Sequence, residues 1–457
     1  MDPAFSSTID LATAIAARKI SAVEALEVHL AQIDRHNGAV NAVVILDREG
    51  ASERAKEADA VLARGDALGP LHGVPFTLKD THETAGMKTT VGFPSFADYV
   101  AKQDSPVVAR LKAAGGVLTG KTNVATMLGD WQSDNPLFGR TGNPWNLDRT
   151  AGGSSGGAAA AVATGMTPFE VGTDMQDSIR LPASFCGVYG LKPTEHRISL
   201  AGAFPDPGGA ARSVRLMSCL GPLARTVEDL ALIYQIIAGP DGSDTDLAPV
   251  PVEPMETLNL KSLRIAIAPS FHGFPVAADI SAAIESFARQ LQGEGAAVEE
   301  AKLPKLDLHE DLEQGGELIG MMLEAAQPEP PEQPSTVSRW FESLACRDRS
   351  IRAWDRFFET CDALLCPVAM CTAFPHCEPG TSIEVDGKQQ SYWMLPAYGA
   401  VFNYSGHPAL SLPCGQDRDG LPIGLQLVGK RWSESRLLGI AKAIEPLTGG
   451  FRRPPNY

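Results

Sequence analysis

Residues 150–194 read TAGGSSGGAAAAVATGMTPFEVGTDMQDSIRLPASFCGVYGLKPT, a stretch rich in Gly, Ser and Thr. No residue from Thr150 to Phe169 carries a formal charge, and none from Gln389 to Gln416 does. The Gly, Ser and Pro content of both stretches argues against helices that span a lipid bilayer. They therefore predict buried segments of a folded protein with many tight backbone positions.

A P-loop pattern occurs upstream of this stretch, as Gly115-x4-Gly120-Lys121-Thr122. A true P-loop follows a strand and opens a helix, so that its backbone amides face a phosphate. Here the residues before Gly115 have a helical pattern, and a short strand, Val117–Thr119, falls inside the motif. We therefore expect a junction of helix, glycine and strand at this position.

A nucleophile-elbow pattern, G-x-S-x-G, occurs as Gly152-Gly-Ser154-Ser-Gly156. The elbow needs a strand directly before it and a histidine later in the chain. Residues 143–150 have the composition of a turn, which argues against such a strand. Five candidate histidines have no distinctive sequence setting, so we expect them in ordinary surface or core positions: His196, His272, His309, His376 and His407.

A longer pattern offers one explanation for both of these motif matches. GGSSGG at 152–157, an Ala-rich segment and GTDMQDSIRLP at 172–182 resemble the signature of the amidase signature family of serine C–N hydrolases. Six further segments resemble the family in the same order: GVPFTLKD (73–80), GKTNV (120–124), FGRTGNPW (138–145), FCGVYGLKPT (185–194), GHPALSLPCG (406–415) and GLPIGLQLVG (420–429). The resemblance implies an α/β fold, an α/β/α sandwich with a central mixed β-sheet flanked by helices.

The resemblance also implies a catalytic relay. Ser178 would be the nucleophile, Ser154 would relay its proton after a cis peptide bond, and Lys79 would be the terminal base. An amide is a poor electrophile, so its hydrolysis needs an activated nucleophile, a proton for the leaving nitrogen and an oxyanion hole. Lys79 must be neutral to accept a proton, although the pKa of a free lysine lies near 10.4. Burial beside serine hydroxyls would lower this pKa.

Other site residues follow from the resemblance. Ser155 would orient Ser154 or its loop, and Arg180 would hold the signature loop through Asp174 or a simple ion pair. Leu128, Gly129 and Asp130 match a stretch that lines the acyl side of the cleft in some family members. Four backbone amides would form the oxyanion hole, those of Met175, Gln176, Asp177 and Ser178.

The chain departs from the signature directly before the nucleophile, where Gln176 and Asp177 replace two glycines. Backbone donors survive such a change unless the position needs φ > 0. A carboxylate 4 Å from the developing oxyanion would repel it by about 4 kcal/mol at an effective dielectric of 20. We expect the Asp177 side chain to turn toward backbone N–H groups or a cation, while its own N–H points into the hole. Gln176 would point outward or contact substrate in the cleft.

Periodicity along the chain predicts the main elements. The first sixty residues are helical, with a capping box at Ser21 and Glu24. A strand–helix–strand order after the Pro-rich stretch Ala248–Pro254 favours a mainly parallel sheet. Its elements are Leu263–Ala268, Ile280–Gln292 and Ala297–Ala301. Asp362–Pro367 and Leu421–Gly429 are further strands, and Gln327–Pro334 is an exposed loop. We expect a helical segment, 1–65, packed on an amidase signature domain, 66–457, as one unit.

Composition limits the partners. The 457 residues carry 39 basic and 55 acidic side chains, a formal charge of −16, which argues against nucleic acid and anionic membranes. Eight cysteines without a C-x-x-C pair predict neither a disulfide framework nor a zinc site. The N-terminus lacks the pattern of a signal peptide. We expect a cytoplasmic monomer or homodimer that needs no metal or cofactor and acts on a small amide or carbamate.

Three functions remain open at this level. The resemblance favours an amidase or urethanase that works through an acyl-enzyme, with esterase activity as a side reaction. Gln176 and Asp177 suggest the alternative of a non-catalytic binding protein on the same scaffold. The family also includes ammonia-supplying amidotransferase subunits, which commonly carry Gln after the Ile-Arg pair, where this chain has Leu181. Leu181 therefore favours a free-standing enzyme with a less polar pocket.

Overall fold

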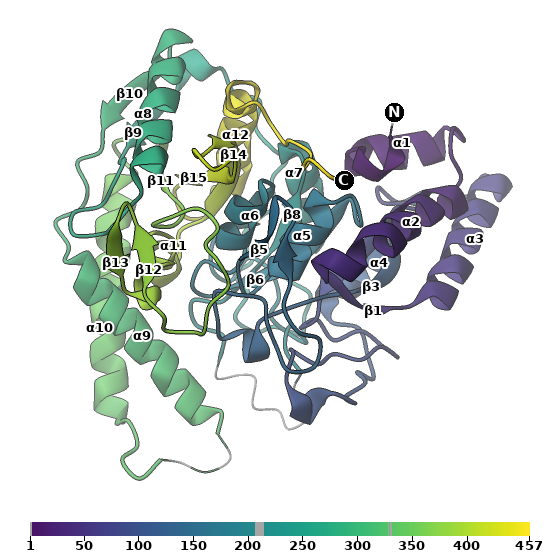
Figure 1. The fold of residues 1–457 in the computed structure, drawn as a ribbon, viewed down its shortest axis with the longest axis horizontal. Helices are drawn as coiled ribbons and strands as arrows, with labels where there is room; N and C mark the ends of the chain where they lie inside the picture. Colours follow the sequence, from purple (N-terminus) through teal and green to yellow (C-terminus); the bar gives the residue numbers. More distant parts are fainter. Residues whose placement is uncertain (1, 206–213, 328, 330) are drawn as a thin grey trace.

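An eight-stranded sheet forms the centre of the molecule, as the computed structural model shows for residues 2–205, 214–327, 329 and 331–457 (Figure 1). Two of its strand pairs, β10–β9 and β9–β11, are parallel, and the others are antiparallel. The sheet is therefore mixed, as the family resemblance predicts. In spatial order its strands are β10 (Ala297–Glu300), β9 (Arg264–Ile267), β11 (Ala363–Pro367), β15 (Pro422–Val428), β14 (Ala409–Gln416), β7 (Tyr189–Lys192), β8 (Cys219–Ala224) and β6 (Phe169–Asp174).

A mainly parallel sheet, the expectation from the strand–helix–strand pattern, is wrong for the sheet as a whole. The pattern describes β9, the helix α8 (Ala278–Gly293) and β10 correctly, and these two strands are parallel. The remaining strands come from distant parts of the chain, and β14 and β15 form an antiparallel hairpin. A local pattern could not predict which distant strands would become neighbours.

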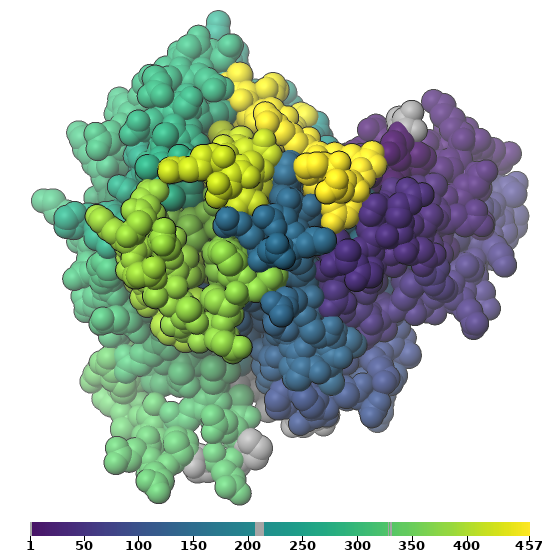
Figure 2. Space-filling view, viewed as in Figure 1, coloured from purple at the N-terminus to yellow at the C-terminus, as the bar shows by residue number. Residues whose placement is uncertain are grey.

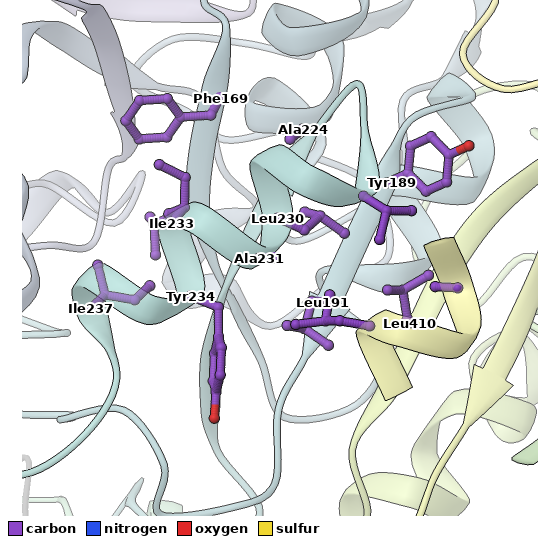
Figure 3. Packing of buried hydrophobic residues seen from close by; sticks show 14 of the residues in the cluster. Phe169, Tyr189, Leu191, Ala224, Leu230, Ala231, Ile233, Tyr234, Ile237 and Leu410 are labelled. Atoms are coloured by element: carbon purple, nitrogen blue, oxygen red, sulfur yellow. The ribbon is translucent and has the colours of Figure 1, made fainter. Parts of the chain in front are cut away.

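Two helical layers cover the sheet. On β11, Ala363 and Leu365 belong to a core with helices α7 (Val227–Ile237), α8 and α12 (Glu434–Thr448). Leu364 and Cys366 point to the other face, where α10 (Val337–Phe357) and α11 (Ala397–Tyr404) pack. This alternation along one strand places helices on both faces and confirms the α/β/α sandwich. Figure 3 shows the first layer at α7, where Ile233 lies on the side of Phe169 and Leu230 lies on the side of Tyr189 and Leu191.

Helix α5 (Gly156–Ala163) lies inside the molecule, and all of its residues are buried. Its small side chains, GGAAAAVA, allow the close approach of neighbouring backbone. A Cβ added to Gly157 would lie 2.4 Å from the backbone N of Asn123. The Ala-rich segment therefore permits close packing against β6, β2 and the following helix α6 (Arg180–Cys186).

A second sheet has three strands in the order β1 (Val43–Leu46), β3 (Val117–Thr122) and β2 (Pro75–Lys79). Its edge strand β2 faces β6, the edge strand of the large sheet. Side chains of the β6 region join the two edges: Thr77 N donates to Thr167 Oγ1 (3.1 Å), and Thr77 Oγ1 donates to Glu170 Oε1 (2.7 Å). This junction places the end of β2 beside β6.

The N-terminal helices α1 (Thr8–Ala16), α2 (Ala22–Val40) and α3 (Arg48–Arg64) form one side of the molecule (Figures 1 and 2). The predicted capping box is confirmed, because Ser21 and Glu24 cap α2 reciprocally. The Asp229 carboxylate of α7 accepts the first amides of α1, from Thr8 (2.8 Å) and Ile9 (3.1 Å). These contacts attach the N-terminal segment to the centre, while the domain boundary at residue 65 stays a prediction.

The remaining helices are α4 (Pro106–Ala113) and α9 (Leu308–Ala325), which forms a projecting hairpin with α10 (Figure 1). The predicted loop Gln327–Pro334 lies between α9 and α10, and part of it falls outside the described residues. Two small hairpins complete the fold, β4 (Gly142–Asn143) with β5 (Asn146–Thr150) and β12 (Ile383–Val385) with β13 (Lys388–Gln390). Within the described ranges, no helix has the length and apolar character needed to cross a bilayer.

The close approach at Gly157 leads to a stability prediction. Gly157→Ala should lower the free energy of unfolding by about 1–3 kcal/mol, because the new methyl overlaps the Asn123 backbone. Gly316→Ala is the matched control, since Gly316 lies in the interior of helix α9 with open space around it. It should raise stability by roughly 0.5–1 kcal/mol through helix propensity. Denaturant unfolding of both variants checks this, and equal effects would contradict the packing described for α5.

Candidate active site

Lys79 ends strand β2 and is completely buried. Its Nζ donates hydrogen bonds to Ser154 Oγ (2.8 Å) and Thr173 Oγ1 (2.7 Å). Burial lowers the pKa of Lys79 to about 7, against the opposing charges of Asp174 and Glu170. A lysine with this pKa is substantially neutral near pH 7, so it can accept a proton from a neighbouring hydroxyl.

Ser154 follows a cis peptide bond between Gly153 and Ser154. Ser133 Oγ supports this turn, because it donates to Ser154 O (3.2 Å) and accepts from Gly156 N (2.7 Å). The glycines of the motif are required by close contacts: a Cβ on Gly153 would lie 2.6 Å from Asp130 O. The sequence predicts Ser154 as a site residue, but Ser133 and Thr173 carry no motif that identifies them.

Ser178 lies between strand β6 and helix α6 and is 5% exposed. Gly172 of β6 lies close to the residues that follow both serines. A Cβ added to Gly172 would lie 2.9 Å from Ser155 Oγ and 3.1 Å from Ile179 Cγ1. The residues that follow the two serines therefore lie on the same side of β6. Ser155 Oγ also donates to Thr173 O (3.4 Å), which ties the turn to the strand. The structure thus brings Lys79, Ser154 and the Ser178 loop into one buried neighbourhood.

Arg180 holds the Ser178 loop through its buried guanidinium. It donates to both carboxylate oxygens of Asp174 at 3.0 Å, which agrees with the predicted pairing. Burial alone would raise the pKa of Asp174, but Arg180 lowers it to about 2. Asp174 in turn accepts the amides of Asp177 (2.9 Å) and Ile179 (3.1 Å). One ion pair therefore determines the backbone on both sides of Ser178.

Asp177 adopts φ = +75°, a conformation that favours glycine. Its carboxylate turns toward a cation, as expected, with Oδ1 3.2 Å from Arg180 Nε. It is buried against Gly399, where a Cβ would overlap it, and neither oxygen has a hydrogen bond within the described residues. Burial raises the pKa of Asp177 well above its usual value.

The backbone N–H of Asp177 points in a different direction from the one expected. We expected its N–H to point into the oxyanion hole, but that N–H donates to Asp174 Oδ1 and to Asn403 Oδ1 (3.3 Å). The Asp174 carboxylate is the stronger acceptor because it is charged. Of the four amides expected in the oxyanion hole, three are left as candidate donors, those of Met175, Gln176 and Ser178.

The predicted acyl-side stretch, Leu128–Asp130, lies beside the Ser154 turn. Leu128 has φ = +61°, and Asp130 Oδ1 accepts a hydrogen bond from Tyr392 Oη (2.5 Å). Gln132 also donates to Tyr392 Oη (3.2 Å) and to Cys377 O (2.7 Å). This stretch is thus bonded to residues far along the chain, and Asp130 O contacts Gly153 directly.

The two competing motifs do not form their sites. Gly120, Lys121 and Thr122 lie inside strand β3, and helix α4 precedes them, so the P-loop arrangement is absent. Strand β5 does precede Ser154, contrary to the expected turn, but it belongs to a two-stranded hairpin. No histidine of the described ranges hydrogen-bonds to Ser154, whose hydroxyl partner is Lys79. Within the same ranges, no group of three His, Cys, Asp or Glu residues is arranged to hold a metal ion.

Comparison with known proteins shows which proteins this chain resembles over most of its length. A model of the amidase family matches residues 24–315 and 316–438. The chain is 33% identical to a glutamyl-tRNA(Gln) amidotransferase subunit from Moorella thermoacetica, over 96% of both proteins. It is 34% identical to the indoleacetamide hydrolase of Bradyrhizobium diazoefficiens, over 97% of this chain and 86% of that protein.

Solved structures agree with this relationship. A 6-aminohexanoate cyclic dimer hydrolase complexed with substrate superposes with a TM-score of 0.82 at 30% identity, covering 99% of each chain. A bacterial aryl acylamidase of the amidase signature family superposes with a TM-score of 0.83 at 26% identity, covering 97% of this chain and 96% of that one. The motifs, the mixed sandwich and these matches together show that the chain belongs to the amidase signature family of C–N hydrolases.

Proposed function

We propose that this protein hydrolyses small amides or carbamates through a covalent acyl-enzyme, with Ser178 as nucleophile, Ser154 as proton relay and Lys79 as base. The observation that carries this proposal is the hydrogen bond from the buried Lys79 Nζ to Ser154 Oγ, 2.8 Å long. A buried lysine with a pKa of about 7 and a serine partner has the properties of a general base. Metal and cofactor play no part in the proposed reaction.

The proposed reaction has two halves. In the first, Ser178 Oγ attacks the carbonyl carbon, its proton passes to Ser154, and the Ser154 proton passes to neutral Lys79. The tetrahedral intermediate then collapses with cleavage of the C–N bond. The proton returns through Ser154 to the leaving nitrogen, which departs as an amine and leaves an ester on Ser178. In the second half water replaces Ser178 as the attacking group, and the same relay releases the carboxylic acid of an amide or the carbonic acid half-ester of a carbamate.

The oxyanion of each tetrahedral intermediate needs preorganised donors. We assign this role to the backbone amides of Met175, Gln176 and Ser178. Asp177 contributes through its position: its carboxylate lies against Arg180 and Gly399, and its N–H is bonded to Asp174. The negative charge that argued for a non-catalytic protein is therefore turned toward a cation, which favours the hydrolase.

The surroundings of the loop favour a substrate with an apolar part. Met175 packs against a cluster that Met217, before β8, forms with residues of helices α9, α10 and α11, among them Leu318 and Tyr404. Leu181, where amidotransferase subunits commonly have Gln, is buried in another apolar cluster with Trp131. We therefore place amides and carbamates with aryl or alkyl groups ahead of glutamine, and we propose a free-standing enzyme, monomeric or homodimeric, that acts in the cytoplasm.

The amidotransferase subunit is the second candidate, because relatives with that name match the chain as well as the indoleacetamide hydrolase does. The two functions differ in their substrate. Release of ammonia from glutamine by the isolated protein, at a rate above that for aryl amides and carbamates, would favour the amidotransferase. The reverse order would favour the free-standing hydrolase.

The first prediction concerns the nucleophile. A fluorophosphonate should label the native protein and should fail to label Ser178→Ala, since only an activated serine reacts. Ser178→Ala should lower kcat about 10⁴-fold, and Ser154→Ala and Lys79→Ala should have similar effects. Double variants should lose little more than single ones, because the three residues act as one relay. Full turnover in any single variant would remove that residue from the proposed relay.

The second prediction concerns pH. Because the relay needs neutral Lys79, kcat/KM should rise with pH through about 7 and level off above it. Measurement of kcat/KM between pH 5 and 10 with an uncharged carbamate checks this, since the substrate itself does not titrate there. A midpoint near 10, the value for an exposed lysine, would contradict the burial of the base. EDTA should leave the profile unchanged.

The third prediction concerns Asp177. Asp177→Asn should keep turnover within a few-fold, because the side chain faces away from the reacting atoms, and Asn tolerates positive φ. The folded state raises the pKa of Asp177, so the native protein should lose stability as pH rises above its unfolded pKa near 3.9. The variant should lack this component of the pH dependence. Unfolding from pH 4 to 8 measures it, with turnover measured on the same samples.

Replacement of both Gln176 and Asp177 by Gly should also leave the chemistry largely intact, since the hole uses backbone donors. A large loss of turnover in this double variant, with the fold retained, would show that one of the two side chains takes part in the reaction.

A further inference from the structure

Two sheet edges meet at Lys79. Strand β2 ends the order β1-β3-β2, and β6 ends the order of the eight-stranded sheet. An edge strand leaves backbone N–H groups without a ladder partner, and a buried one must find other acceptors. A side chain supplies such an acceptor here, because Thr167 Oγ1 accepts the amide of Thr77 (3.1 Å).

Glu170 is the charged member of this junction, and it is completely buried. Its Oε1 accepts from Thr77 Oγ1 (2.7 Å), and its Oε2 accepts from Val171 N (3.1 Å). The same strand presents Thr173 Oγ1 to Lys79 Nζ (2.7 Å). Strand β6 thus holds β2 at two points, at Thr77 through Glu170 and at the Lys79 side chain through Thr173.

The proposed mechanism does not use Glu170, yet a buried carboxylate is costly unless its charge is compensated. Within the described residues, no cation makes an ion-pair contact with it. The charged and titratable groups around the junction come from three strands and the turn after β2: Lys79 and Asp80 from β2 and its end, His82 from the turn, Lys121 from β3, and Asp174 from β6. Helix α5, which packs on the same junction, contains only Gly, Ala and Val.

The titration of Glu170 is linked to that of Lys79. Burial raises the pKa of Glu170 to about 7, against hydrogen bonds that lower it, and burial lowers the pKa of Lys79 to about 7. A negative charge on Glu170 stabilises the ammonium form of Lys79, and a neutral Glu170 removes that stabilisation. An interaction of this kind between two buried groups couples their titrations.

We propose that Glu170 is a positioning residue for the relay: its carboxylate fixes strand β2 at Thr77, two residues before Lys79, and its charge controls whether Lys79 carries a proton. This inference rests on the proposed role of Lys79 as base. It adds a second ionisable group, on another strand, that sets the pH range in which the hydrolase works.

Direct titration of Lys79 tests the proposal without any turnover. Protein labelled with [ε-¹³C]lysine gives a resonance for each lysine, and the one missing in Lys79→Met identifies Lys79. Glu170→Gln keeps the shape of the side chain and removes its charge. The midpoint of the Lys79 titration should fall by at least about half a pH unit in this variant, because the stabilising negative charge is gone.

Glu434→Gln is the matched control. Glu434 is also buried, accepts from Thr194 N (2.7 Å) and pairs with Arg197, so this variant removes a structural carboxylate away from the junction. It should leave the Lys79 midpoint unchanged. An unmoved midpoint in folded Glu170→Gln would overturn the proposal, as would an equal change in both variants.

A second variant serves if Glu170→Gln does not fold. Thr77→Val removes the hydroxyl that donates to Glu170, which makes the charged carboxylate less favourable. The Lys79 midpoint should then fall in the same direction by a smaller amount, and no change would overturn the proposal.

Turnover separates this inference from the proposed function. The midpoint of kcat/KM against pH should fall by the same amount as the Lys79 midpoint in Glu170→Gln. A lowered Lys79 midpoint without detectable turnover in the native protein would support the coupling and overturn the hydrolase. Normal turnover of the native protein, with an unmoved Lys79 midpoint in Glu170→Gln, would support the hydrolase and overturn the coupling.

Discussion

The buried ion pair between Arg180 and Asp174 is the interaction on which the site depends. A guanidinium has five N–H donors, and all five of its hydrogen bonds are made here. Two go to Asp174 on β6, and the others go to Gly399 O and Asn403 Oδ1 of α11 and Gln426 Oε1 of β15. A buried charge is tolerated when it is paired and its donors are satisfied, so the loop, α11 and β15 must assemble together.

The unusual residue before the nucleophile is explained by this arrangement. Arg180 faces two carboxylates but makes its hydrogen bonds to only one of them, Asp174, so Asp177 has a nearby cation and no hydrogen bond. Gly399 supplies the space, since a Cβ there would lie 2.1 Å from the Asp177 carboxyl group. Replacement of a glycine with φ > 0 by Asp is therefore accommodated by a glycine more than two hundred residues later in the sequence.

The site residues that sequence analysis identified and those that it missed differ in kind. Lys79, Ser154, Ser178 and Arg180 lie in segments whose order and spacing match a family signature. Ser133, Thr173 and Glu170 make hydrogen bonds across a turn or between two sheet edges. A Ser, Thr or Glu in that position has no periodicity or spacing of its own. The packing of β2 against β6 gives Thr173 and Glu170 their place, and the turn at Ser154 gives Ser133 its place.

The sequence by itself determined the family, the mixed α/β/α class and the residues proposed for the relay, because these depend on segments whose residues are close together in the chain. Tertiary structure decided how distant strands pair, where the Asp177 amide points and which groups surround Lys79. The physical reason is burial. The pKa of Lys79 falls to about 7 because water is excluded from its side chain, and several elements from separate parts of the chain exclude that water together.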